Sequence, residues 1–397
     1  MNHDEYNAIL NKVIIVGFSI YVLGAVVSVA LMNIGLGLAC LAWLIKKIKT
    51  FDFKLPTTPY DKYILFFILA LVLSLLDSVN LSRSLDDFKR LWIPILLFYI
   101  VVDSQPNLKV IKKWLAVLFV TMGGSIIYAF VQYYQSVGRV HANIFVMEFA
   151  SLLTFMALYT IIYACLGEIK LSTKLLLGVT SILTLAALVF TKTRGAWLAF
   201  IISLSSILFL RNKKYLIYFL VIAILFLALA PTFVPQEYIN RFISIFDLEH
   251  NKSNITRLNL WRGALLIYQD YYINGIGLNN FSKVIHREPY LHQPINSDAH
   301  AHNVFLQLAA ETGTLGVGAF ILLFGLIIRS LTAYYQSAEN KNLKLFFLGS
   351  VGVIISYLSH GLTEYNLPDM YVSRLVWFIL AISVILKKKY NLKLESD

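Results

Sequence analysis

The sequence has little charge. Only 14% of its 397 residues are Asp, Glu, Lys or Arg, whereas 58% are hydrophobic. Soluble domains carry about a quarter charged residues, so the composition excludes an ordinary soluble protein. The mean hydropathy of +0.70 is typical of an integral membrane protein. Alternation of apolar and polar residues at the strand period is also lacking, so we interpret the apolar runs as membrane helices rather than barrel strands.

Cysteines and several catalytic motifs are also scarce. Cys40 and Cys165 both fall inside apolar runs, which excludes a disulfide framework or a cysteine metal site. No Gly-x-Ser-x-Gly elbow occurs, which argues against a Ser-His-Asp hydrolase. No Asp-x-Asp pair occurs either. Glu148 is nearly the only ionisable residue predicted inside the apolar runs, and it lies toward the outer end of its run. This lack of ionisable groups deep in the spans argues against ion-coupled transport.

Twelve apolar runs predict an all-α polytopic membrane protein, with one membrane domain over residues 1–397 and one large loop, residues 232–302, between helices nine and ten. The predicted spans are 13–30, 32–46, 62–78, 91–103, 114–134, 144–165, 175–190, 196–210, 214–231, 314–330, 345–361 and 371–386. The first run lacks a small-residue cleavage site, so we expect a span and not a removed signal peptide.

The net charge of +12 is distributed unevenly between the two sides of these spans. With the N-terminus inside, 21 of the 34 Lys and Arg residues fall on inside segments and seven in short outside loops. Short loops on the cytoplasmic side carry the basic excess, so we expect both termini in the cytoplasm and the 232–302 loop outside. The positive charge is thereby explained by topology, and no nucleic-acid partner is expected.

Within the large loop, residues 255–272 predict an amphipathic helix. Its predicted face consists of Arg257, Leu260, Trp261, Ala264, Leu265 and Tyr268. Residues 274–281, NGIGLNNF, follow it. A Gly-x-Gly pair without a preceding strand is weak evidence for nucleotide binding, so we interpret this stretch as a turn.

Arginines collect on the predicted outer face. Arg139 and Arg194 lie in short loops, and Arg257 and Arg262 lie in the loop helix. A guanidinium group can pair two oxygens at once, which suits a lipid-linked diphosphate. The alternative is that these arginines extend to phospholipid head groups. Arg257 and Arg262 lie about 140° apart around a helix, so we expect only one of them at the phosphates, with Arg257 the first choice.

His302 is the candidate general base, because histidine titrates near neutral pH and can accept a proton from a sugar hydroxyl. The alternative is a histidine that caps the helix beginning after it. His300 and His302 also suggest a metal site. However, residues i and i+2 of a helix point apart and no nearby cluster completes a ligand set, so we expect metal-independent chemistry.

Three motifs resemble the O-antigen ligase family and its superfamily of polymerases and protein O-oligosaccharyltransferases. His302-Asn303, nine residues and then Gly313-Thr-Leu-Gly316 are similar to the ligases' histidine motif. TKTRGAW around Arg194 is the second match, and TRLNLWRGAL followed by INGIGLNNF is the third. Together they run over residues 191–316 in motif order.

The resemblance implies a GT-C-like, inverting, metal-independent glycosyltransferase without a cofactor, in the bacterial inner (plasma) membrane. It would move a glycan from undecaprenyl diphosphate to a hydroxyl of lipid A core oligosaccharide, at the periplasmic face. The implied base is His302. The implied diphosphate-binding residues are Arg194, Arg257 or Arg262, and Arg139; the implied acceptor-side residues are His300, Asn303, His360 and Glu364.

Other activities remain open at this point. A polymerase would use the same donor and arginines but another lipid-linked glycan as acceptor. Protein O-glycosylation and a polyprenyl-lipid transporter without bond-forming activity are further alternatives.

Overall fold

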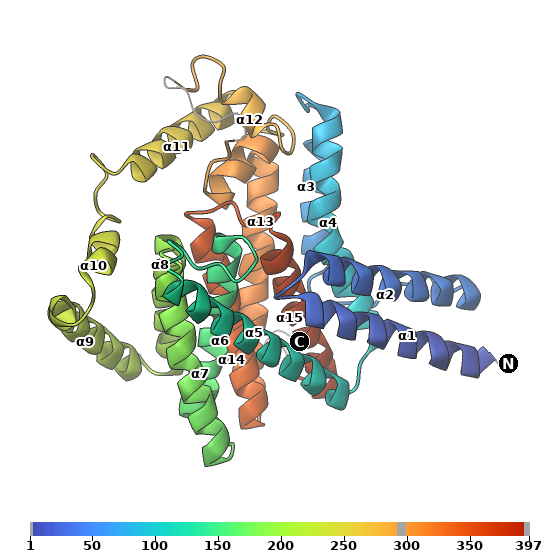
Figure 1. The fold of residues 1–397 in the computed structure, drawn as a ribbon. Helices are drawn as coiled ribbons and strands as arrows, with labels where there is room; N and C mark the ends of the chain where they lie inside the picture. The colour runs from blue at the N-terminus through green and yellow to red at the C-terminus, as the bar shows by residue number, and fades with distance from the viewer. Residues whose placement is uncertain (1–2, 292–298, 393–397) are drawn as a thin grey trace.

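The computed structural model describes residues 3–291 and 299–392, which form helices and no strand (Figure 1). The elements before the large loop are α1 (His3–Gly24), α2 (Val29–Thr50), α3 (Asp61–Leu73), α4 (Leu81–Ser104), α5 (Leu108–Tyr134), α6 (Val146–Leu166), α7 (Leu171–Phe190), α8 (Arg194–Arg211) and α9 (Lys213–Leu229). Those that follow are η1 (Ala230–Thr232), α10 (Gln236–Ile243), α11 (Lys252–Asp270), α12 (Phe281–Val284), α13 (Val304–Ser337), α14 (Lys341–Gly361) and α15 (Met370–Lys389).

The all-α polytopic membrane fold is confirmed, because each of the twelve predicted spans falls on a helix. Ten of the described helices are long and apolar enough to cross a bilayer. The two others are α3 and α4. α3 has 13 residues, which span about 20 Å, less than the hydrocarbon thickness. α4 is long enough, but its first turns carry charges that lower the hydropathy of the helix.

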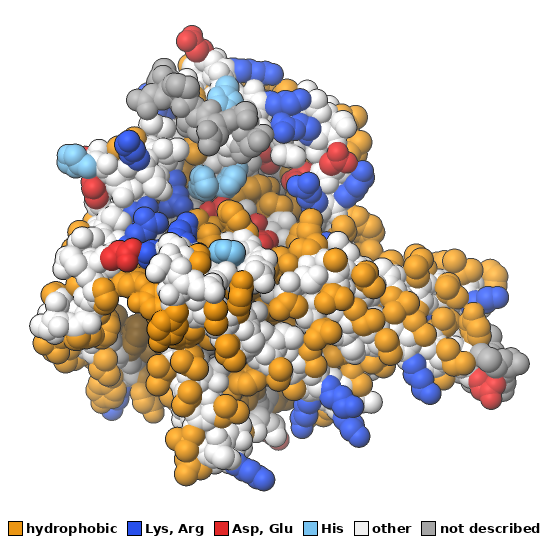
Figure 2. All heavy atoms as spheres, viewed as in Figure 1, with side chains coloured by type: hydrophobic (Ala, Val, Ile, Leu, Met, Phe, Trp, Pro, Cys, Tyr) orange, Lys and Arg blue, Asp and Glu red, His pale blue; other side chains and the backbone are white. Residues whose placement is uncertain are grey.

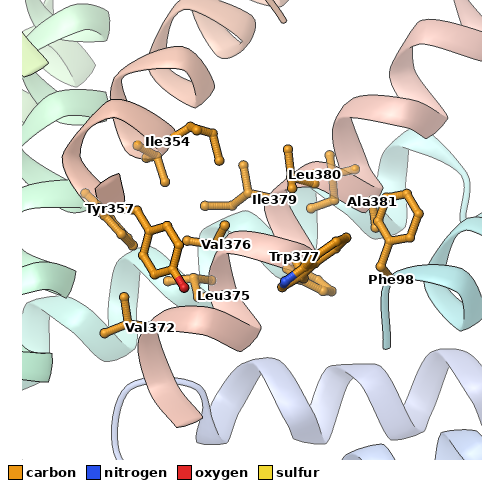
Figure 3. Close-up of a cluster of buried hydrophobic side chains, with 14 of the residues drawn as sticks. Phe98, Ile354, Tyr357, Val372, Leu375, Val376, Trp377, Ile379, Leu380 and Ala381 are labelled. Carbon is orange, nitrogen blue, oxygen red and sulfur yellow. The ribbon is translucent and has the colours of Figure 1, made fainter. Parts of the chain in front are cut away.

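The most buried helices are α14 and α15. α14 packs against α6, α8 and α13, and α15 packs against α4. Aromatic side chains fill their contacts, among them Trp377, Phe98 and Tyr357 (Figure 3). Buried charge is less rare than the sequence suggested: Arg374 lies inside α15, where it donates to Asn33 Oδ1 at 2.7 Å.

The large loop folds as η1, α10, α11 and α12, although residues 292–298 of the predicted loop lie outside the described part. Figure 1 shows α11 and α12 over the start of α13. We call the end of the bundle that they cover the loop end. α11 covers most of the residues predicted as the loop helix, and it buries Leu260, Gly263, Ala264 and Ile267. Leu265 was wrongly assigned to that face; it is 48% exposed, because it lies on the other side of the helix.

Two glycine-containing segments, the turn at residues 274–281 and the break at Gly313, hold the loop against α13. Gly313 breaks the helix with φ +62°. The carbonyls of Ala310 and Glu311, next to that break, accept hydrogen bonds from Ile276 N at 3.1 Å and Gly277 N at 2.9 Å. The Gly-x-Gly stretch is therefore a turn, as predicted, and it docks on the break in α13.

Neither side of this contact has room for a side chain. A Cβ at Gly275 would lie 2.2 Å from the carbonyl carbon of Glu311, and a Cβ at Gly313 would lie 2.1 Å from Ile273 O. Both glycines also have the positive φ that other residues rarely adopt.

Gly313→Ala should lower the free energy of unfolding by about 1–3 kcal/mol, because alanine is strained at this φ and its Cβ overlaps the loop backbone. Gly318→Ala, in the same helix but with nothing near its Cβ, is the control and should be neutral or slightly stabilising. Thermal unfolding of the two variants in detergent measures the difference. Equal midpoints would contradict the role of Gly313.

Candidate functional site

A pocket of about 130 Å³ lies at the loop end, between the first turns of α8, the segment from α10 into α11, and the corner after α14. Its lining residues are Arg194, Gly195, Leu198, Ile245, Leu248, Asn254, Arg257, Leu258, Trp261 and Thr363. Gly195 allows the close approach of α8 to the corner, because a Cβ there would lie 2.1 Å from Thr363 Oγ1. Figure 2 shows Lys and Arg side chains gathered beside histidines at this end.

Arg194 holds the loop against the bundle. Its Nη1 donates to Ser244 O at 2.7 Å and to Ser244 Oγ at 3.0 Å, and its Nη2 donates to Asn254 Oδ1 at 2.9 Å. A guanidinium group has five N–H donors, so these three bonds leave donors for a ligand. Arg194 is therefore both an anchor of the loop and a cationic wall of the pocket.

Arg257 and Arg262 have different surroundings, which the sequence left undecided. Arg257 lines the pocket with Arg194, and its guanidinium makes no hydrogen bond to another described residue. Burial lowers the pKa of Arg257, the charge of Glu364 opposes that change, and the charge of Arg241 adds to it. Arg262 is exposed and does not line this pocket. Arg257 thus has hydrogen-bond donors inside the pocket that no described residue uses. Arg262 offers no donor to the pocket, because its side chain does not line it.

Arg241 is a cation that the sequence analysis missed. It lies on α10 and donates from Nε to Lys192 O at 3.2 Å. Its charge acts on Arg139, Arg194 and Arg257. A single arginine on a short helix, outside every recognised motif, gave no signal in the sequence.

Arg139 belongs to the same cluster but is tied to the turn before α8. It donates from Nε to Thr191 O and from Nη2 to Thr193 Oγ1, both at 2.9 Å. Burial lowers the pKa of Arg139, and the charges of Arg241 and Arg257 lower it further. Four arginines thus share one region in which their charges repel.

His302 lies beside this cluster and is paired with a carboxylate. Its Nδ1 is 3.3 Å from Glu364 Oε2. Burial alone would raise the pKa of Glu364, but the hydrogen bond of His302 and the charges of His302, His300 and His360 together outweigh burial, and the pKa falls to about 2. An ionised carboxylate can only accept, so in the neutral form of the His302 imidazole Nδ1 carries the proton and Nε2 has the lone pair. This is the arrangement that a general base requires.

The two histidines do not lie on a helix, contrary to our expectation. α13 begins at Val304, so His300 and His302 lie in the preceding loop, where their ring centroids are 4.0 Å apart. Backbone with φ +47° at His302 turns both rings toward Glu364. Burial, together with the charge of His302, lowers the pKa of His300 to about 4, so His300 is neutral at pH 7.

Glu364 also completes a group that the sequence analysis had excluded. His300, His302 and Glu364 each offer one possible metal ligand atom, and these atoms lie within 4.8 Å of one another. The expectation that no third ligand is near was therefore wrong, because Glu364 is far away in the sequence. Arg257 and Arg139 act electrostatically on Glu364, and their charges disfavour a further cation at the same carboxylate.

A buried hydrogen-bond chain fixes the backbone before His302. Gln307 Oε1 accepts from Ala301 N at 2.7 Å, and Gln307 Nε2 donates to Glu311 Oε1 at 2.9 Å. Glu311 Oε1 also accepts from Phe281 N at 3.1 Å. Glu311 is fully buried in α13, so Glu148 is not nearly the only ionisable residue inside the apolar helices. Its contacts show that Glu311 supports the loop.

Trp261 joins the arginine pocket to the segment that carries the histidine. Its ring lines the pocket, and its Nε1 donates to Ala301 O at 2.9 Å. On the other side, Thr363 lines the pocket and Glu364 follows it in the chain. The histidine–carboxylate pair is thus held directly by the walls of the pocket.

Two residues expected on the acceptor side serve the local structure. The Asn303 side chain caps α13, accepting from Phe305 N at 3.0 Å and Leu306 N at 3.1 Å. The helix cap is thus Asn303 rather than His302. His360 is buried, and its Nδ1 is 2.7 Å from Ser151 Oγ.

These features define a polytopic membrane protein with a pocket lined by arginines beside a histidine–carboxylate pair. Residues 179–323 match the family model described as O-Antigen ligase, which confirms the resemblance over these residues. The match includes Arg194, Arg241, Arg257 and His302, and it ends before Glu364.

One curated relative is the teichuronic acid biosynthesis protein TuaE of Bacillus subtilis (strain 168). It is 22% identical over 132 residues, which are 33% of this chain and 26% of the relative. The chain thus aligns with about a quarter of the length of that protein.

Glu364→Gln should lower the maximal transfer rate roughly a hundredfold, because the imidazolium loses the anion that stabilises it. Glu364→Asp keeps a carboxylate and should retain more of the rate than Glu364→Gln. The rates of both folded variants are measured side by side, and equal losses would mean that Glu364 does not act through its charge.

Proposed function

We propose that the protein is an O-antigen ligase-like glycosyltransferase. It transfers a glycan from undecaprenyl diphosphate to a hydroxyl of lipid A core oligosaccharide, at the periplasmic face of the bacterial inner membrane. The reaction is inverting and needs no metal or other cofactor. The observation that carries the proposal is the position of the His302–Glu364 pair beside a pocket walled by Arg194 and Arg257.

The arginines act on the leaving group. As the bond between the anomeric carbon and the diphosphate oxygen breaks, negative charge grows on the diphosphate. Arg257 and Arg194 hold that charge in the pocket, and Arg241 and Arg139 add to the positive potential. Fixed cations in a partly dry site stabilise a developing anion strongly, so they do the work that a metal ion does in other transferases.

His302 acts on the acceptor. Its Nε2 takes the proton of the acceptor hydroxyl while the hydroxyl oxygen forms the new bond to the anomeric carbon. Glu364, bonded to Nδ1 at 3.3 Å, stabilises the imidazolium that results. Attack from the side opposite to the diphosphate inverts the anomeric centre. The energy comes from the donor linkage, so no nucleotide is consumed.

A second function shares the donor and the site but differs in the acceptor. The relative is named for teichuronic acid biosynthesis, which favours an acceptor other than lipid A core, namely another lipid-linked glycan. The protein would then be a polymerase.

One reconstitution separates these functions. The purified protein receives undecaprenyl-diphosphate glycan and lipid A core in EDTA. Glycan joined to the core supports the ligase, and longer chains on the polyprenyl carrier support the polymerase. Glycan on added protein acceptors would indicate a protein O-oligosaccharyltransferase, and no covalent product with any acceptor would indicate a transporter. Activity lost in EDTA and restored by Zn²⁺ would assign His300, His302 and Glu364 to a metal.

Arg257→Ala should weaken donor binding, because a charged hydrogen-bond donor in a partly buried site contributes about 1.5–3 kcal/mol, which is roughly tenfold to a hundredfold in Kd. Arg262→Ala is the matched control, since it removes the same charge from an exposed position of the same helix. Donor binding to both variants is measured by titration in detergent. Equal weakening by the two changes would contradict the assignment of Arg257.

His302→Ala should abolish most transfer while donor binding stays near normal, since a positioned base contributes about 10² to 10⁴ in rate. Single-turnover product formation and donor Kd are measured on the same folded sample. Near-normal turnover would overturn the base assignment.

A further inference from the structure

A cavity of about 350 Å³ lies among α5, α6, α7, α14 and α15, away from the loop end. We call the end of the bundle opposite to the loop end the far end. α6 ends there, and α5, α7 and α14 begin there (Figure 1). Tyr163 of α6, Leu177 of α7 and Phe346 of α14 line the cavity, and each lies within about two turns of the far end of its helix. The cavity is thus separate from the arginine pocket.

The divergence of α5 and α7 leaves one side of the cavity open. At the loop end the two helices are in contact, because the ring of Phe190 in α7 stacks on Tyr133 of α5 with the ring centroids 4.0 Å apart. Toward the far end α5 runs obliquely away from α7 (Figure 1). α6, α14 and α15 form the back wall of the space between them. The open side of the cavity therefore faces the membrane between the starts of α5 and α7.

The polar groups in the cavity walls already have hydrogen-bond partners. Thr160 Oγ1 donates to the backbone of its own helix, and Tyr159 OH shares a hydrogen bond of 2.9 Å with Ser350 Oγ. Tyr163 OH donates to Asn342 O at 2.7 Å. The other lining residues are apolar. Because water needs several polar partners to occupy a buried site, the cavity suits a hydrocarbon chain.

Lysines flank the open side at the far end. Lys112 of α5 lies three residues before Leu115 and four before Ala116, and both of these line the cavity. Lys174 of α7 lies three residues before Leu177, which also lines it. Residues three and four apart share one face of a helix, so each lysine continues the stripe that lines the cavity. Figure 2 shows Lys and Arg side chains along the lower edge of this face, below hydrophobic ones.

The charge at this mouth is positive. Within the part of the chain that the structure describes, Lys112 and Lys174 form no ion pair. Glu168, in the corner between α6 and α7, is instead paired with Lys341 at 2.9 Å. An apolar cavity below unpaired lysines matches a molecule that carries an anion above a hydrocarbon chain.

We infer that this cavity binds an acyl chain of an anionic phospholipid from the leaflet at the far end, with the lipid phosphate between Lys112 and Lys174. Basic pockets between membrane helices attract anionic headgroups in this way. A carrier lipid with its diphosphate at Arg194 and Arg257 would have its charge at the opposite end of the bundle. The phospholipid site does not depend on the proposed function.

Labelling identifies the occupant. A phosphatidylglycerol with a photoreactive group in one acyl chain is crosslinked to the full-length protein in phosphatidylcholine nanodiscs, and the labelled peptides are identified by mass spectrometry. Label should concentrate on residues 115–122 of α5 and 152–163 of α6, and it should exceed the label from a phosphatidylcholine probe with the same chains. Equal labelling by the two headgroups would overturn the site. So would displacement of the label by undecaprenyl diphosphate at a lower concentration than by phosphatidylglycerol.

Lys112→Ala and Lys174→Ala should each raise the amount of phosphatidylglycerol probe that half-saturates this label about fivefold, equivalent to about 1 kcal/mol. Lys214→Ala is the matched control, because Lys214 is an exposed residue near the start of α9 that does not line the cavity. It should leave the half-saturating amount unchanged. Equal effects of the three variants would mean that the lysines only attract anionic lipid to the membrane surface in general.

Ala116→Trp, which closes the mouth of the cavity, should remove most of the label and the rise in the midpoint of thermal unfolding that phosphatidylglycerol causes. Val120→Trp is the control: Val120 is 69% exposed, one turn further along α5, and does not line the cavity. Each variant is compared with itself, with and without phosphatidylglycerol, so a change in its basal stability does not affect the result. A rise in the midpoint that survives Ala116→Trp, or that is absent from the unmodified protein, would contradict the inference.

Discussion

Repulsion among partly buried cations is the constraint that governs the loop end. Arg139, Arg194, Arg241 and Arg257 act on one another electrostatically in a partly desolvated region, and among the described residues Glu364 is the carboxylate that offsets them. Like charges in such a setting are unfavourable unless an anion joins them. The hydrogen bonds of Arg139 and Arg194 to backbone and loop hold the charges in place, so an anion that entered the site would relieve their repulsion. The tight packing of α8 at Gly195 and the anchoring of α11 both maintain this arrangement.

The helices were predictable because bilayer thickness and hydrophobic runs determine them. His302 and most of the arginines could be singled out because they lie in motifs with recognisable spacing. We expected Glu364 on the acceptor side, yet it is the partner of His302, 62 residues away in the chain. Arg241 was not found at all. The positions of Glu364 and Arg241 depend on how the corner after α14 and α10 pack against α8. Such long-range contacts cannot be predicted from a local sequence pattern.

The histidines were misjudged for a related reason. We expected residues 300–302 to be helical, but Asn303 caps α13, so the preceding residues lie outside the helix. The contact between the two glycine segments was likewise not predictable from local sequence. A turn at residues 274–281 follows from composition, whereas its docking on the break at Gly313 depends on two motifs that each look like an ordinary bend. The angle between Arg257 and Arg262 around the helix predicts that only one of them lines the site. Which of the two faces α8 is seen only in the packing of the folded chain.

α11 sets the distance between the arginine pocket and the segment that carries His302. Asn254, Arg257 and Trp261 lie on one stripe of this helix; Asn254 bonds to Arg194, and Trp261 bonds to the residue before His302. The stretch from the arginine anchor to the histidine support is then about 10 Å, set by the rise of a single rigid element. On the proposed chemistry, only the first sugar of a donor occupies this span. The protein should accordingly be selective for the first sugar ring of the donor and accept glycans of different lengths, since the later sugars extend beyond the stretch that α11 spans.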